Sequence, residues 1–185
     1  TRTPVYVQHG SRDFLLGANF AQRAGVTLLP EVASVQAYGQ NIVLLHGDAL
    51  YPHSPEQADF RALSRTPAWQ ERVANTPVPE RKQTLAEHIW QHAHQPDATQ
   101  PIAAVCLEAL LEAHVSPLQS QPCIVHAHNP VAFTGRFEHT WQGQSLQRWA
   151  LPAWQENQGG YLQLTDQGQW LWQPLSVKIA TPYHT

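Results

Sequence analysis

The chain has 185 residues, a hydrophobic share of 42% and a formal net charge of −3, which suits one globular domain. The small negative charge argues against a broad electrostatic attraction to nucleic acid, and no apolar stretch is long enough to span a membrane. Cys106 and Cys123 lie in apolar runs, so we expect reduced core cysteines rather than a disulfide or a zinc site. Methionine is absent and the chain opens directly on a strand-like run, so we expect further residues of the protein upstream of Thr1.

Short strands and one helix account for the first quarter of the chain. The patterns predict strands at residues 4–8 and 26–30, a helix between them, and a hairpin over residues 31–46. The helix should begin at an N-cap formed by Ser11 or Asp13, bury Phe14 and Phe20, and end at Gly25. The returning hairpin strand contains the run IVLL, which is typical of a strand covered on both faces.

The composition changes between residues 52 and 100, where Gln, His, Arg and Pro become frequent. Two amphipathic helices are expected there, one capped by Ser54 and one beginning near Thr76. We interpret residues 52–100 as a helical insertion within a single domain over residues 1–185. The large apolar side chains of this insertion are Phe60, Leu63, Trp69, Leu85, Ile89 and Trp90. They would either contact a membrane surface or pack against the sheet, and we favour packing.

The second half of the chain predicts a strong helix followed by strands. The helix expected over residues 101–115 has a core stripe of Val105, Leu107, Leu110 and Leu111. Segments of strand length follow His128, and turns are expected at Gly159-Gly160 and Gln167-Gly168. The order of these elements predicts an α/β fold in which helices are layered on a mixed β-sheet.

Three polar clusters stand at the expected ends of strands, and each contains histidine. The clusters are His9 to Asp13, His46 to Asp48, and His126 to His128. Ligands of α/β proteins gather beyond the carboxyl ends of strands, and imidazoles placed there can hold one metal ion or one each of a metal pair. Taken singly, each cluster is better explained as ordinary loop residues. Together they favour a site for metal and phosphate, with Arg12 as a fork for phosphate and Asp48 orienting a ligating imidazole.

The three clusters carry a resemblance to a known family. HGSRDFLLG, LLHGDAL and VHAHNP, in this order, are similar to motifs of the calcineurin-like metallophosphoesterases. The run RDFLLG, with GVTLLPE after it, resembles more narrowly the UDP-2,3-diacylglucosamine hydrolases of lipid A biosynthesis. The resemblance covers nearly the whole chain, with the helical insertion matched only loosely. It implies an N-terminally incomplete calcineurin-like fold and Mn²⁺-dependent hydrolysis of the substrate's diphosphate, which yields lipid X and UMP.

The resemblance also implies roles for individual residues. His46 and His126 would ligate one of two Mn²⁺ ions and His128 the other, while Arg12 would stabilise charge on the phosphoryl oxygens. Ser11 stands where the family has a ligating Asn, so it is a further candidate ligand, although a hydroxyl is a poorer one. Substrate contacts would fall at Ser11, Arg12, Ser54, Gln91, Gln95, Ala98 and His126.

Several positions depart from the family's motifs. His53 and Ser54 stand in place of an acidic pair, and Ala98 in place of a lysine of the insertion. In the family, Asp-x-His and Gly-Asp motifs supply the carboxylate that bridges the two metals. These 185 residues contain no Asp-x-His, and their only Gly-Asp, Gly47-Asp48, already belongs to the His-Gly-Asp motif. Without that carboxylate two cations would repel each other, so we expect at most one weakly held metal ion in this chain alone.

These observations leave alternative functions open. One is a lipid A pathway diphosphatase, and another is a catalytically impaired or non-catalytic relative that binds a nucleotide-lipid or a partner protein. The residues at Ser11, Ser54 and Ala98 favour the relative without catalysis, and an α/β module with chance histidines is the weakest alternative. We expect a UDP-linked acylated glucosamine as ligand, no nucleic acid, and a cytoplasmic location with peripheral contact to the inner membrane. The sequence identifies no protein partner.

Overall fold

The computed structural model describes residues 3–51, 53–92, 102–115, 122–129, 135–154 and 158–176. In chain order its elements are β1 (Tyr6–Val7), α1 (Ala18–Ala24), β2 (Thr27–Leu28), β3 (Val32–Ala37), β4 (Gln40–Leu45), the short 3-10 helix η1 (Asp48–Leu50), α2 (Pro55–Ser64), α3 (Pro67–Asn75), α4 (Val78–His92), α5 (Ala104–His114), β5 (Cys123–Asn129), β6 (Gly135–Trp141), β7 (Gln144–Pro152), β8 (Gln158–Leu164) and β9 (Trp170–Ser176). The predicted α/β class, with helices layered on a mixed sheet, is confirmed.

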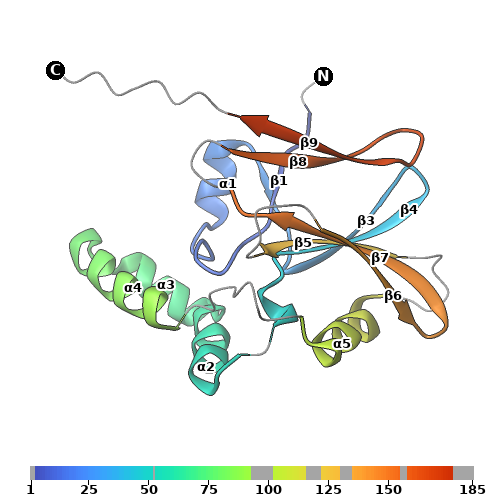
Figure 1. Cartoon of the computed structure of the whole chain (residues 1–185). Helices are drawn as coiled ribbons and strands as arrows, with labels where there is room; N and C mark the ends of the chain where they lie inside the picture. The colour runs from blue at the N-terminus through green and yellow to red at the C-terminus, as the bar shows by residue number, and fades with distance from the viewer. Residues whose placement is uncertain are drawn as a thin grey trace.

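A five-stranded mixed sheet in the order β3-β4-β5-β7-β6 forms the centre of the molecule (Figure 1). Strands β4, β5 and β7 run parallel to one another, and β3 and β6 pair antiparallel at the two edges. The register places Leu45 beside His126, and His126 beside Ala150. Because parallel strands end at the same edge of a sheet, the residues that follow Leu45 come to lie next to His126.

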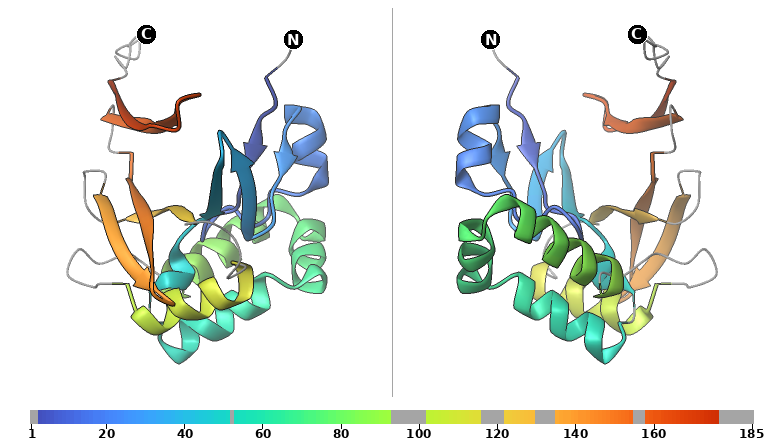
Figure 2. Two further views of the ribbon diagram at one scale, coloured as in Figure 1. Left: turned by 90° about the vertical axis from the view of Figure 1, so that its right-hand side faces the viewer. Right: turned by 90° about the vertical axis from the view of Figure 1, so that its left-hand side faces the viewer.

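Both faces of this sheet are covered, as Figures 1 and 2 show, with α5 on one face and the β8–β9 hairpin on the other. Successive residues of β4 point to opposite faces, so Val43 packs toward α5 while Ile42 packs toward the hairpin. The hairpin is also tied to the β3–β4 turn by hydrogen bonds. Trp170 Nε1 donates to Gln40 Oε1 (2.7 Å), and Gln40 Nε2 donates to the Gly168 carbonyl oxygen (2.6 Å).

Helices α2, α3 and α4 lie beside the sheet, within the segment for which the sequence predicts helices (Figure 2). Ser54 caps α2 as predicted, in a capping box with Gln57. The apolar side chains of the three helices form a core of their own with the loop after β1. Phe14 from that loop lies 5.8 Å from Trp69 and 6.2 Å from Phe60, measured between ring centroids.

Phe60 and Trp69 are buried, but in this second core around Phe14 and not against the sheet as predicted, because α2 and α3 pack on the loop after β1. Leu63, by contrast, is exposed on α2. The side chains of Ile89 and Trp90 lie outside the described residues. Within the described residues, no helix is long and apolar enough to cross a membrane.

The predicted start of the first helix is wrong. α1 begins only at Ala18, and no side chain caps it. The Asp13 carboxylate accepts a hydrogen bond from the backbone N–H of Gly10, so it closes the preceding loop instead of capping the helix. Phe14 is buried from this loop and Phe20 is exposed on α1, because the loop rather than the helix faces α2 and α3.

Two further local predictions are also wrong. Val105 is 70% exposed on α5, since Leu107, Leu110 and Leu111 alone face the sheet. Gly159 and Gly160 lie inside β8 instead of forming a turn. A side chain at either glycine would collide with a tryptophan ring, so these glycines make room for Trp154 and Trp172. The turn predicted at Gly168 is confirmed, with Gly168 at a φ of 76°.

Candidate functional site

The ends of β1, β4 and β5 meet at one edge of the molecule. Gln8, directly after β1, donates from Nε2 to the carbonyl oxygens of Pro30 and Leu44, each at 2.9 Å, and so ties β1 to the strand before His46. A β-carbon built on Gly10 would lie 3.1 Å from Cε1 of His46. Two of the three predicted polar clusters are therefore in contact through the backbone of Gly10 and the His46 ring.

His46 and His128 are in direct contact. Nε2 of His46 lies 3.1 Å from Nδ1 of His128, and the ring centroids are 4.9 Å apart. His128 has a φ of 50°, which is uncommon for a residue other than glycine, and the β5 register is irregular between His126 and Asn129. Such irregularities re-aim side chains near functional sites. Beyond this irregularity the His128 ring contacts His46, whereas the His126 ring before it contacts Arg148.

His126 is 1% exposed, and both nitrogens of its ring have hydrogen-bonding partners. Nδ1 lies 2.6 Å from the Ala127 carbonyl oxygen, and Nε2 lies 2.6 Å from Nη1 of Arg148. Burial, reinforced by the charge of Arg148, lowers the pKa of His126 to about 4. His126 is consequently a neutral imidazole at physiological pH.

Gly47 allows the end of β4 to pass close to the end of β5. Its φ of 112° is one that side-chain-bearing residues rarely adopt. A β-carbon there would lie 2.7 Å from Nδ1 of His126 and 2.8 Å from the Ala127 carbonyl oxygen. Only glycine satisfies both the backbone conformation and the close approach, so Gly47 is a structural requirement of the site.

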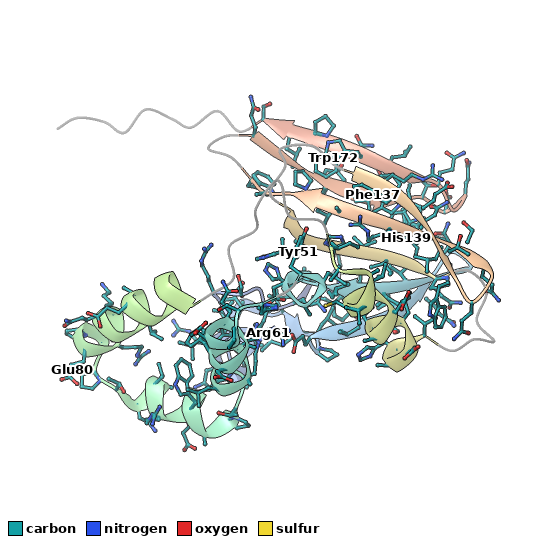
Figure 3. All side chains as sticks on the ribbon, turned by 60° about the horizontal axis from the view of Figure 1, so that its bottom comes forward. Tyr51, Arg61, Glu80, Phe137, His139 and Trp172 are labelled. Atoms are coloured by element: carbon teal, nitrogen blue, oxygen red, sulfur yellow. The ribbon has the colours of Figure 1, made fainter. Side chains whose placement is uncertain are left out.

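Arg148, which the sequence does not single out, occupies the buried centre of this region at 6% exposure. Its Nε donates to Nε2 of His139 (3.0 Å), and its guanidinium carbon lies 4.0 Å from the Phe137 ring centroid. Phe137 and His139 both belong to β6 (Figure 3). Burial lowers the pKa of Arg148, and within the described part of the chain no carboxylate forms a salt bridge with it.

A second group of arginines surrounds Asp48, which is buried two residues after His46. Asp48 Oδ2 lies 3.2 Å from Nε of Arg61 and 3.7 Å from Nη2 of Arg65, both on α2. Arg65 also donates to the Gly10 carbonyl oxygen (3.4 Å), which links α2 to the loop after β1. Asp48 therefore holds α2 against the site. Its predicted role in orienting a ligating imidazole stays a prediction.

The charged residues around His46 shift its pKa in opposite directions. Burial is the largest influence and lowers the pKa of His46, with smaller contributions of the same sign from Arg65 and Arg12. Asp48 and Asp13 oppose this shift. Arg12 is exposed on the loop before α1, and its charge acts on His46.

The described residues supply only part of a metal site. Two cis ligands about 2.1 Å from one ion are roughly 3 Å apart, which matches the His46–His128 nitrogen separation of 3.1 Å. Both ring nitrogens of His126 are engaged elsewhere, and the described residues contain no group of three or more His, Cys, Asp or Glu side chains arranged to hold a metal ion. The three-histidine set predicted from the sequence therefore does not fit a metal ion as it stands.

Of the remaining predicted site residues, the structure describes the side chains of Ser11 and Ser54 but not those of the other three. Ser11 is half-buried in the loop beside Arg12. The Ser54 hydroxyl accepts from the backbone N–H of Gln57 (3.3 Å) and donates to Glu56 (2.8 Å), so it serves as the cap of α2. The side chain of Gln91 lies outside the described residues, as do Gln95 and Ala98. Substrate contacts from these three positions stay predictions.

Comparison with curated proteins identifies relatives over most of the chain, although no protein-family model matches it. The UDP-2,3-diacylglucosamine hydrolase of Chromobacterium violaceum is 38% identical over 173 residues, which are 90% of this chain and 68% of the relative. The enzymes of the same name from Chromohalobacter salexigens and Aromatoleum aromaticum are each 32% identical, over 89% and 85% of this chain and 65% and 63% of their own lengths. The chain thus spans about two thirds of the length of these relatives. With this identity over this share of both sequences, the chain belongs to the family of the UDP-2,3-diacylglucosamine hydrolases.

Proposed function

We propose that this chain acts in the hydrolysis of UDP-2,3-diacylglucosamine, the compound that the names of its relatives specify. The bond broken would be in the diphosphate, which yields lipid X and UMP. The observation that carries the proposal is the contact between His46 and His128 at the edge where two parallel strands end. We propose this pair as the holder of a divalent ion, Mn²⁺ by family resemblance.

The arginines near the pair support a diphosphate as the group bound. Arg12 and Arg65 both influence His46 electrostatically, and Arg61 shares the Asp48 carboxylate with Arg65. A guanidinium presents planar N–H groups that match phosphate oxygens. Asp48 holds Arg65, whose charge acts on His46, and Arg61 is held by both Asp48 and Glu31, so these guanidinium groups are in place before a substrate arrives.

A second candidate function is binding of a nucleotide-lipid or a partner protein without turnover. It is favoured by the engagement of both His126 nitrogens and by Ser11, which stands where the family resemblance places a ligating Asn. Binding of the nucleotide-lipid shares its ligand with the first candidate and differs from it only in that the diphosphate is not cleaved.

We also propose that the protein acts in the cytoplasm, in peripheral contact with the inner membrane, because the acyl chains of the substrate reside there. Leu63 on α2 and Val78 on α4 are exposed apolar side chains of the segment that would approach the lipid.

The test is release of UMP from UDP-2,3-diacylglucosamine by the purified chain with saturating Mn²⁺, alongside the Chromobacterium violaceum relative. Slow release that is lost in His46→Ala but kept in His114→Ala supports hydrolysis, since His114 is an exposed residue at the end of α5. Binding of the substrate by calorimetry without UMP release supports the second candidate. Neither release nor binding contradicts both.

A further inference from the structure

We propose that Arg148 holds His126 in a single tautomer and thereby keeps it out of the coordination of a metal ion at the His46–His128 pair. Arg148 would act as a positioning residue, through His126, and not on the substrate. The metal in this statement rests on the proposed function, whereas the tautomer is a property of the chain alone.

The hydrogen bonds of His126 determine where its proton lies. A carbonyl oxygen can only accept, so Nδ1, at 2.6 Å from the Ala127 oxygen, must carry the hydrogen. A guanidinium can only donate, so Nε2, at 2.6 Å from Nη1 of Arg148, must offer its lone pair. The two contacts are independent and give the same answer, a neutral ring with hydrogen on Nδ1.

This tautomer leaves no nitrogen for a metal ion. An imidazole coordinates a metal through an unprotonated nitrogen, and the only one in His126 faces Arg148. A metal ion at Nε2 would have to displace the guanidinium and would stand beside its positive charge. Nε2 of His46 and Nδ1 of His128 share one hydrogen across 3.1 Å, so an ion there would displace that hydrogen and not a guanidinium.

Arg148 cannot easily swing away from His126. Its position in β7 lies opposite Ile124 of β5 and Phe137 of β6, and its Nε donates to Nε2 of His139. The Phe137 ring lies against the guanidinium. Among the described residues no carboxylate pairs with Arg148, so losing His126 would leave a buried cation with one acceptor fewer.

The first experiment reads the tautomer directly and needs no metal. Ring nitrogens of the ¹⁵N-labelled wild-type chain are observed by long-range ¹H–¹⁵N correlation NMR at pH 7, with His126 assigned from the signals lost in His126→Gln. We expect a protonated Nδ1 and an unprotonated Nε2. A protonated Nε2 on His126 would overturn the proposal, whatever the metal does.

The second experiment measures Mn²⁺ affinity from the free-ion EPR signal in wild type and Arg148→Gln. We expect about tenfold tighter binding in Arg148→Gln, because the ion no longer competes with a charge-assisted hydrogen bond. Arg136→Gln is the matched control, since Arg136 is an exposed arginine on the neighbouring strand β6, and it should bind as wild type does. Equal or weaker binding by folded Arg148→Gln refutes the competition.

The fold of each variant is checked by near-ultraviolet circular dichroism. If Arg148→Gln does not fold, Arg148→Lys retains a buried cation but loses the planar fork, and its affinity should still exceed that of wild type. If no form of the chain binds Mn²⁺, the metal part of the proposed function fails. The NMR measurement of the His126 tautomer then tests the positioning role of Arg148 by itself.

Discussion

Nε2 of His46 and Nδ1 of His128 lie 3.1 Å apart although 82 positions separate the two residues in the chain. The parallel register of β4 and β5 brings the two strand ends together, and the left-handed backbone of His128 aims its ring at His46. The strand register and the His128 backbone together determine that the two rings are in contact. This contact is the centre of the proposed metal site.

Gly47→Ala should destabilise the protein by about 3 kcal/mol, because the new β-carbon meets both an unfavourable φ and the His126–Ala127 segment. Gly143→Ala is the control. Gly143 has a φ of 76°, but a β-carbon added there would meet nothing within 4 Å, so this variant should lose only about 1 kcal/mol. Urea unfolding measures both. Equal losses would show that the close approach at Gly47 contributes nothing.

Asp48→Asn should lower the free energy of unfolding by about 2 kcal/mol. The amide removes the carboxylate that Arg61 and Arg65 share, while Arg61 keeps its ion pair with Glu31. The side-chain exposures of 26% and 21% keep the loss below that of a fully buried pair. Glu138→Gln removes the exposed partner of Arg136 and should change stability by no more than about 0.5 kcal/mol. Indistinguishable unfolding curves for the two variants would contradict the role of Asp48.

Stability should fall as the pH falls from 6.5 toward 4. The pKa of His126 is about 4 in the folded chain and 6.5 without the fold, so in this window the unfolded state binds a proton that the native state does not. Above pH 6.5 both states are neutral, and below pH 4 both are protonated. The full loss from His126 is about 3 kcal/mol.

The pKa values of His46 and His139 are also lowered, so both add to this loss. His126→Gln isolates the contribution of one residue. Its unfolding free energy should depend less steeply on pH than that of wild type. Parallel curves for wild type and His126→Gln would contradict the buried, neutral state of His126.

Local signals in the sequence suffice for the elements that border the site. The Ser54 capping box, the Gly39 turn and the apolar run before His46 each depend on neighbouring residues, and the structure has all three. The start of α1 could not be predicted in this way, because Asp13 has a competing backbone donor at Gly10.

The partners of the site residues depend on distant parts of the chain. Arg148 reaches His126 only because β7 pairs with β5, and Arg65 reaches Asp48 only because α2 folds back on β4. The motif that contains His126 suggests a metal ligand. No residue adjacent to His126 in the sequence indicates that Arg148 donates a hydrogen bond to its Nε2. His128 likewise needs a positive φ that its neighbours do not signal.

The most direct measurement of the central claim is a double-mutant cycle of UMP release with saturating Mn²⁺, using His46→Ala, His128→Ala and the double variant. The 185-residue chain should be at least about a hundredfold slower than the Chromobacterium violaceum relative, since it lacks the Asp-x-His and Gly-Asp motifs implied by the family. Because the two histidines would hold one ion, each single variant should lose the residual rate and the double variant should lose no more. Losses that multiply, or a rate unchanged in either single variant, would contradict the account.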